Sequence, residues 1–266
     1  MTPGEKLVCT AALAVGLVGS GGCPSFVNLQ TARALDKGQF ELTQAASVAG
    51  LTHNGLAGNG GGAEPVVYVA ARYGVADGID VGLKFEPLVG FITSATLQLH
   101  HGNLFDLALT PDIGYFQFPG PVSYGTNISL EQLSIHPTYS IILFNLPLLV
   151  GINLPGEHQL VVGPRLSGWI SLSETIYEAG SSSATTSTHD GLELFAGGGV
   201  GMSFKVGPKV RVMPEFDVMK PALWTGLGGA ECGSISCAPY PTDGLIYQIS
   251  FGITTGLGGF DNGGFL

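Results

Sequence analysis

Residues 79–86 read Ile-Asp-Val-Gly-Leu-Lys-Phe-Glu, in which apolar residues alternate with charged or small ones. Successive side chains of a β-strand point to opposite faces, so this pattern gives the strand one apolar and one charged face. Residues 209–220 and 244–256 repeat the alternation. The pattern predicts an all-β protein whose strands each carry one clean apolar face.

The composition limits the class of protein. Charged residues make up 11% of the 266 residues, against roughly 25% in a typical soluble domain. The 42 glycines disfavour a helical fold, and the 45% hydrophobic content is the opposite of the composition of disordered chains. Because 20 acidic residues face only 10 basic ones, a nucleic-acid partner has no electrostatic support.

Ten strands follow when the alternation is traced along the chain. They are expected at 39–51, 64–76, 79–86, 91–101, 104–118, 139–153, 158–173, 191–206, 209–220 and 244–256. Tight hairpin signals stand at Asp77-Gly78, Gly102-Asn103, Pro155-Gly156 and Gly207-Pro208. Longer polar connections alternate with them, at 52–63, 119–138, 174–190 and 221–243.

Short turns at one end and long loops at the other are the layout of an antiparallel transmembrane β-barrel of the bacterial outer membrane. We therefore predict a barrel of about ten strands with both chain ends in the periplasm. Four prolines fall inside the proposed strands, where each removes a hydrogen-bond donor: Pro111, Pro147, Pro164 and Pro214. They leave eight or twelve strands as alternatives.

The position of the charges favours a barrel over a soluble sandwich. Apart from Lys220, which ends a strand and is not counted, the strand-borne charges lie on the face opposite the apolar stripe. They are Glu41, Arg72, Asp80, Lys84, Glu86, Asp106, Asp112, Arg165, Glu193, Lys205, Arg211, Glu215 and Asp217. A sandwich would place them in water, whereas a barrel turns the stripes to lipid and encloses the charges. Outward aromatics near strand ends, at Phe40, Tyr73, Phe105 and Phe204, fit an interfacial girdle. The enclosed charges would form a paired network that fills a narrow lumen.

The N-terminus has the features of an export signal. Leu7 to Gly19 carries no charge and follows Lys6, which fits the hydrophobic region of a signal peptide. The Gly22-Cys23 ending resembles the lipobox of bacterial lipoproteins, although Ser20 stands where that family prefers Leu. The resemblance implies acylation of Cys23. Ordinary signal cleavage nearby, with Cys23 left as a thiol, is the alternative.

Two further cysteines lie close together, Cys232 and Cys237, among Gly, Ser and Pro residues. In an oxidising compartment this spacing favours a small disulfide loop. A zinc site is the alternative, but no second Cys/His pair lies near it in the sequence.

Taken together, the lipobox-like cysteine, the polar leader and the alternating strands resemble bacterial outer-membrane β-barrel proteins of uncharacterised function. The leader contains Gln30-Thr31-Ala32-Arg33 and Lys37-Gly38. The resemblance implies location and fold: a signal peptide over 1–22, a lipid-anchor cysteine and periplasmic leader over 23–38, the barrel over 39–256 and a short tail over 257–266.

No motif for catalysis, metal binding or a cofactor is present, so none of these is expected. The glycines of 197–201 lie in a strand pattern with no helix after it, which rules out a phosphate loop. One hypothesis is a non-enzymatic barrel with outer-membrane lipid around it and an extracellular ligand at loops 119–138, 174–190 and 221–243.

The other hypothesis is a protease- or lipase-like hydrolase at the extracellular rim. The layout resembles the ten-stranded outer-membrane proteases, which use carboxylates with a His there. The nearest residues are His189-Asp190, His53, Glu131 and His136. Adjacent His and Asp residues in a strand point to opposite faces, which disfavours catalysis. His100-His101 is expected at a turn, as surface polarity rather than a metal pair.

Overall fold

The computed structural model contains eleven strands in one antiparallel sheet. It describes residues 28–52, 64–86, 90–119, 133–179, 182–227 and 244–257. The strands are β1 (Phe40–Thr52), β2 (Glu64–Ala76), β3 (Ile79–Glu86), β4 (Gly90–His101), β5 (Phe105–Leu109), β6 (Asp112–Pro119), β7 (Leu133–Leu154), β8 (His158–Ala179), β9 (Ser182–Gly207), β10 (Val210–Leu227) and β11 (Leu245–Leu257). Among the described residues no helix combines the length and apolarity needed to cross a membrane.

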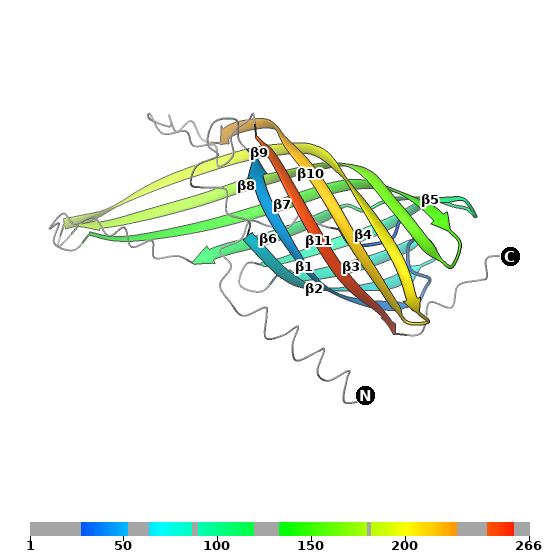
Figure 1. Ribbon diagram of the computed structural model, residues 1–266. Coiled ribbons are helices and arrows are strands. Elements are labelled where there is room, and N and C mark those ends of the chain that lie inside the picture. Colours follow the sequence, from blue (N-terminus) through cyan, green and yellow to red (C-terminus); the bar gives the residue numbers. More distant parts are fainter. Residues whose placement is uncertain are drawn as a thin grey trace.

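The sheet closes on itself. Apart from β5 and β6, each strand pairs with its neighbours in sequence, and β1 pairs with β11 from Phe40–Leu257 to Thr52–Leu245. β5 and β6 both lie between β4 and β7 and keep the same register, so they are two parts of one strand. The result is a closed antiparallel barrel of ten strands (Figure 1). The predicted fold class and strand number are confirmed.

Prolines lie where one strand of the barrel is divided in two. Pro111 separates β5 from β6, and Pro147 lies beside it on β7. Neither proline can donate a ladder bond, but their carbonyls still accept. Thr110 N–H donates to Pro147 O over 3.1 Å, and Ala95 N–H donates to Pro111 O over 3.0 Å. The barrel therefore stays closed where the ladder is broken.

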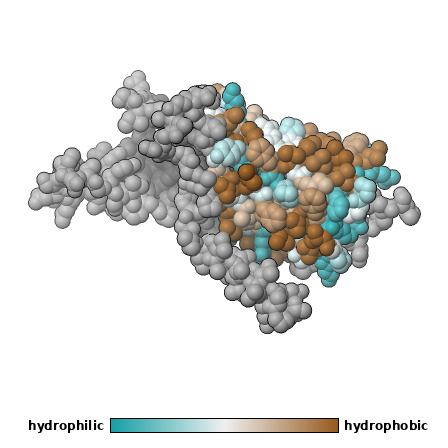
Figure 2. Space-filling view, viewed as in Figure 1, coloured by the Kyte–Doolittle hydropathy of each residue, from teal (hydrophilic) through white to brown (hydrophobic). Residues whose placement is uncertain are grey.

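The outer surface of the barrel is apolar. Leu83, Phe85, Ile113, Ile249 and Phe251 are each more than half exposed, and large apolar patches, with some polar residues between them, lie on the visible face of the described strands (Figure 2). Such an exposed apolar surface on a closed barrel is stable only in lipid. The chain is a transmembrane β-barrel.

The two ends of the barrel differ. We call the end with the turns 77–78, 102–104, 155–157 and 208–209 the turn end, and the opposite end the loop end. Tyr73, Phe105 and Phe204 are exposed near the turn end, as expected for a girdle, whereas Phe40 is half-buried.

At the loop end three predicted loop boundaries are wrong. β8 and β9 stay paired as far as Ala179–Ser182, so most of 174–190 is strand. β7 already begins at Leu133, inside 119–138, and β10 continues to Leu227, inside 221–243. β7, β8 and β9 consequently run past the ends of the other strands (Figure 1). The polar residues within 174–190 predicted a loop, whereas they continue the hairpin of β8 and β9.

Candidate functional site

The predicted charged residues line the inside of the barrel, called the lumen below. Nine are buried: Glu41, Arg72, Asp80, Glu86, Asp106, Arg165, Glu193, Glu215 and Asp217. The other four are half-buried: Lys84, Asp112, Lys205 and Arg211. Most contribute to a few ion-paired groups, because a buried charge without a partner is strongly disfavoured.

One group is centred on Arg72 of β2. Arg72 lies directly opposite Glu41 of β1 in the strand register, and its Nη1 is 3.3 Å from Glu41 Oε2. On its other side Nε donates to Asp80 Oδ1 over 3.1 Å. Two carboxylates from adjacent strands thus share one guanidinium, which suits the fork of donors on arginine.

A second group spans β8 to β10. Arg165 Nη2 lies 3.2 Å from Glu215 Oε1, and Nη1 lies 2.9 Å from Asp217 Oδ1. β9 runs between these strands, and Gly199 is paired with Asp217. A Cβ at position 199 would lie 2.1 Å from Asp217 Oδ1. Glycine is therefore required there for the carboxylate to lie across β9.

A third group lies around β3 and β6. Lys84 Nζ is 3.1 Å from Glu86 Oε1 and 4.7 Å from the centre of the Tyr68 ring. Asn145 Nδ2 donates to Asp112 Oδ2 over 3.1 Å. The Ser167 hydroxyl in turn donates to Asn145 Oδ1 over 2.6 Å. Polar residues that carry no charge therefore belong to the same network.

Glu193 of β9 is the exception. Its side chain is buried, and within the described part of the chain neither carboxylate oxygen has a hydrogen-bond partner. Trp169 lies opposite it in register. Glu193 is thus a predicted lumen charge for which the described residues provide no ion pair.

The expected periplasmic leader lies inside the barrel instead. Residues 28–36, called the lumenal segment below, run through the turn-end half of the lumen without joining the sheet. Leu29, Ala32, Ala34 and Leu35 are buried. The chain reverses at Lys37–Gly38, where Gly38 has φ +87°, a left-handed conformation that favours glycine. This correction moves part of 23–38 from the periplasm into the barrel.

Side chains of the wall hold the segment by its main chain. The Asn28 and Leu29 amides donate to Glu215 Oε1 and Oε2, over 3.2 and 2.7 Å. The Leu35 amide donates to Asp80 Oδ2 over 3.0 Å. Glu215 and Asp80 therefore each bind an arginine of the wall, Arg165 and Arg72, and also accept from an amide of the segment.

Two glutamines complete the contacts. Gln159 Oε1 accepts from the Ala32 amide over 2.9 Å, and Gln98 Oε1 accepts from the Ala34 amide over 2.7 Å. Gln98 Nε2 also donates to Ala32 O over 3.0 Å. Gln98 and Gln159 carry no charge, so they do not stand out among the predicted lumen residues. Gln159 has the inward parity of Val161 and Arg165 on β8, a signal that could have revealed it.

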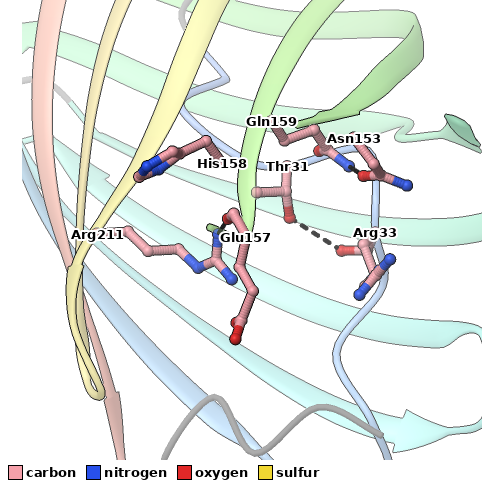
Figure 3. A pocket seen from close by; sticks show the side chains of 7 residues that line it. All are labelled: Thr31, Arg33, Asn153, Glu157, His158, Gln159 and Arg211. Carbon is pink, nitrogen blue, oxygen red and sulfur yellow. Dashed lines mark hydrogen bonds between the residues drawn. The ribbon is translucent and has the colours of Figure 1, made fainter. Parts of the chain in front are cut away.

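At the turn end a small cavity opens beside the segment (Figure 3). The Thr31 hydroxyl donates to Arg33 O over 3.3 Å, and Arg211 Nη1 donates to Glu157 O over 3.0 Å. Lys205 Nζ lies 2.6 Å from Glu157 Oε2. The cavity measures about 30 Å³, which is space for about one water molecule rather than for an organic ligand.

The loop-end half of the lumen is filled differently. Apolar side chains from seven strands meet there and form what we call the apolar layer. Its members are Ile92, Phe116, Ile141, Leu143, Trp169, Phe195, Met219 and Ile246. The Trp169 and Phe195 rings lie 4.7 Å apart between centroids. The layer fills the part of the lumen beside β4 and β6 to β11.

These contents limit the chemistry of the lumen. Two further cavities in the described lumen measure about 40 and 10 Å³, far below the roughly 300 Å³ of a small-molecule site. No group of three metal-ligating side chains occurs among the described residues. The described lumen is a packed interior.

The other predicted site residues are placed as follows. His101 Nδ1 lies 2.7 Å from Asp106 Oδ1, whereas His100 stacks on Phe105, so the two rings do not converge. His53 and Glu131 lie outside the described residues, as do the side chains of His136, His189 and Asp190. The lipid-anchor Cys23 and the disulfide pair Cys232 and Cys237 also lie outside them, and both stay predictions.

Comparisons with solved structures return outer-membrane barrels among the most similar chains. No protein-family profile matches the chain, and no curated protein matches it. Among solved structures, Ail of Yersinia pestis is 9% identical, over 83% of this chain and 99% of Ail, with a TM-score of 0.34. The translocator domain of the autotransporter NalP from Neisseria meningitidis is 11% identical over 95% of each chain, with a TM-score of 0.43. The outer-membrane protease OmpT from Escherichia coli is 8% identical, over 82% of this chain and 92% of OmpT, with a TM-score of 0.40. Nothing about function is taken from likenesses this distant.

Proposed function

We propose that this protein is a non-enzymatic outer-membrane lipoprotein whose barrel holds a binding surface outside the cell. The surface consists of the loop-end parts of β7 to β10 and the connections within 119–138, 174–190 and 221–243. Acylated Cys23 would add an anchor to the one that the barrel already provides in the lipid.

The length of the loop-end strands carries this proposal. β7 and β8 have 22 residues each and β9 has 26, whereas a membrane-spanning strand needs about 9–11. At about 3.3 Å per residue and a tilt of about 40°, the surplus reaches roughly 30 Å beyond the lipid. A paired sheet of this length is a rigid support for binding residues.

The contents of the lumen favour binding outside over transport or catalysis inside. The apolar layer and the lumenal segment fill the described interior one above the other. A conduit needs a continuous polar route, and a catalytic site needs space for a substrate. The described lumen has cavities of one or two water molecules instead.

The test shortens the projection without touching the barrel. Thr175 and Ser187 are paired on β8 and β9, so replacing 176–186 by Asn-Gly keeps their register. Cells that display the full chain or the shortened variant are compared for adherence to surfaces coated with defined proteins and glycans. We expect adherence to fall in the shortened variant while heat-modifiable gel mobility is retained. Equal adherence of both to every coating would contradict the proposal.

The lipid anchor has its own test. Cys23→Ser should abolish metabolic labelling with a radioactive fatty acid and leave the barrel folded, because the described barrel makes its contacts without this residue. A labelled Cys23→Ser protein, or an unlabelled parent protein, would remove the lipoprotein part of the proposal.

A further inference from the structure

We propose that the turn-end half of the lumen is a binding site for a short stretch of polypeptide, and that the lumenal segment 28–36 is its resident ligand, which leaves and returns as a unit. Main-chain amide donors would contribute most of the recognition, and side chains would add to it. This inference is independent of the binding surface proposed for the loop end.

The first argument is the pattern of main-chain contacts. Amides of five of the nine residues of the segment donate to side chains of the wall, namely those of Asn28, Leu29, Ala32, Ala34 and Leu35. The acceptors come from β3, β4, β8 and β10. Acceptors on four strands thus surround one segment that forms no strand of its own and bends at Ala32–Arg33, and they bind it through its main-chain donors.

The second argument is the balance of charge. The predicted wall charges comprise eight carboxylates and five basic groups. The segment supplies what the wall lacks: amide donors for Glu215 and Asp80, and the Arg33 guanidinium, whose Nη2 is 3.2 Å from Asp106 Oδ2. An empty site would leave carboxylates partly desolvated without these partners, which is costly. The wall is thus complementary to a peptide that brings donors and one cation.

The third argument is the fit of the side chains. Ala32 is completely buried, and Ala34 is 7% exposed, so these two positions accept only small residues. Leu29 packs in an apolar cluster with Tyr68 and Met213. The preferred ligand is therefore a peptide with a large apolar residue, then two small residues flanking a basic one.

The fourth argument is that the segment is separable from the barrel. β1 pairs with β11 without it, so its departure breaks no strand pairing. Hydrogen bonds between main-chain atoms of the two parts lie at the rim, just after the segment, where Gly38 N–H donates to Gly74 O over 2.8 Å. Water-sized cavities adjoin it on both sides. A short tether raises the effective concentration of such a ligand to roughly millimolar, which explains why it is bound.

The test follows the amides of the segment by NMR in the full chain, labelled with ¹⁵N and reconstituted in lipid nanodiscs. We expect hydrogen exchange at Leu29, Ala32, Ala34 and Leu35 to report one common opening, at least about tenfold more frequent than that of β1 and β11. The amides of Gln30 and Thr31, which donate no hydrogen bond to any described residue, should show no protection.

Competition then tests the binding site itself. Unlabelled peptide with the sequence of 28–36 is added at several millimolar, and a scrambled peptide serves as control. The authentic peptide should move the resident amide signals to their free positions and leave the strand signals in place. The scrambled peptide should move neither.

Two matched variants keep the result clear if competition is weak. Leu29→Asp places a carboxylate beside Glu215, so protection at Ala32, Ala34 and Leu35 should be lost together while the barrel stays folded. Thr31→Asp adds the same charge beside Arg33 and Arg211 and should retain that protection. Both substitutions lie in the segment, so the side chains of the wall are unchanged.

Three outcomes would overturn the proposal. The segment amides exchange only at the rate of the strand amides, the authentic peptide has no more effect than the scrambled one, or the two Asp variants behave alike. Any of them would make the segment a permanent part of the barrel interior.

Discussion

Both halves of the lumen are lined by inward-facing side chains of the barrel strands, but they are filled in different ways. At the loop end the apolar layer consists of wall side chains that satisfy one another. At the turn end the wall presents carboxylates and glutamines that need donors, and a separate piece of chain supplies them. An apolar interior can be complete in itself, whereas a polar one needs every acceptor matched.

The largest effect expected from this difference is at Arg165. Arg165→Met leaves Glu215 and Asp217 buried without their cation and should lower the free energy of unfolding by about 3–5 kcal/mol. Urea unfolding of the barrel in lipid vesicles, read by gel mobility without boiling, measures the change. A loss below about 1 kcal/mol would mean that the polar half does not depend on its ion pairs.

The apolar half should respond to a cavity. Phe195 is completely buried against Trp169, so Phe195→Ala should cost about 3 kcal/mol in the same measurement. Phe251→Ala is the control, because Phe251 is 51% exposed on the outer surface and leaves no enclosed cavity. Equal losses for both would contradict an apolar layer that packs as a core.

Glu193 lies opposite Trp169 of the apolar layer. Its replacement should stabilise the barrel, in contrast to the two replacements above. Glu193→Gln removes a buried charge that has no partner among the described residues and should raise the free energy of unfolding by about 1–2 kcal/mol. Glu86→Gln is the control and should lower it, since Glu86 is paired with Lys84. Destabilisation by Glu193→Gln would instead reveal a partner for this carboxylate.

The smallest effect belongs to the rim of the turn end. Lys205 pairs with Glu157, and the side chains are 19% and 30% exposed. Lys205→Met should therefore change the free energy of unfolding by less than about 1 kcal/mol, because water replaces much of the lost interaction. A loss as large as that at Arg165 would extend the buried network to the rim.

The sequence predicted the wall of the barrel better than its contents. The period-two alternation is local, so ten strands and their two faces could be traced residue by residue. The polar residues of Ser182–His189 led to the prediction of a loop, although their β-propensity is high. The threonines Thr185, Thr186 and Thr188 favour the strand that is found there.

The lumenal segment had no such local signal. Asn28 contacts a residue 187 positions away, and Leu35 one 45 positions away. Nothing in the polar pattern of 28–36 distinguishes a leader from a segment enclosed by strands. Its place depends on acceptors that come together only when the barrel closes.

The reversal at Lys37–Gly38 has a consequence for biogenesis. The lumenal segment precedes every strand in the chain and is joined to β1 by only a few residues. During export it therefore emerges before any part of the wall. Since the wall is completed only when β11 meets β1, its interior occupant is already tethered at the first strand when the last one arrives.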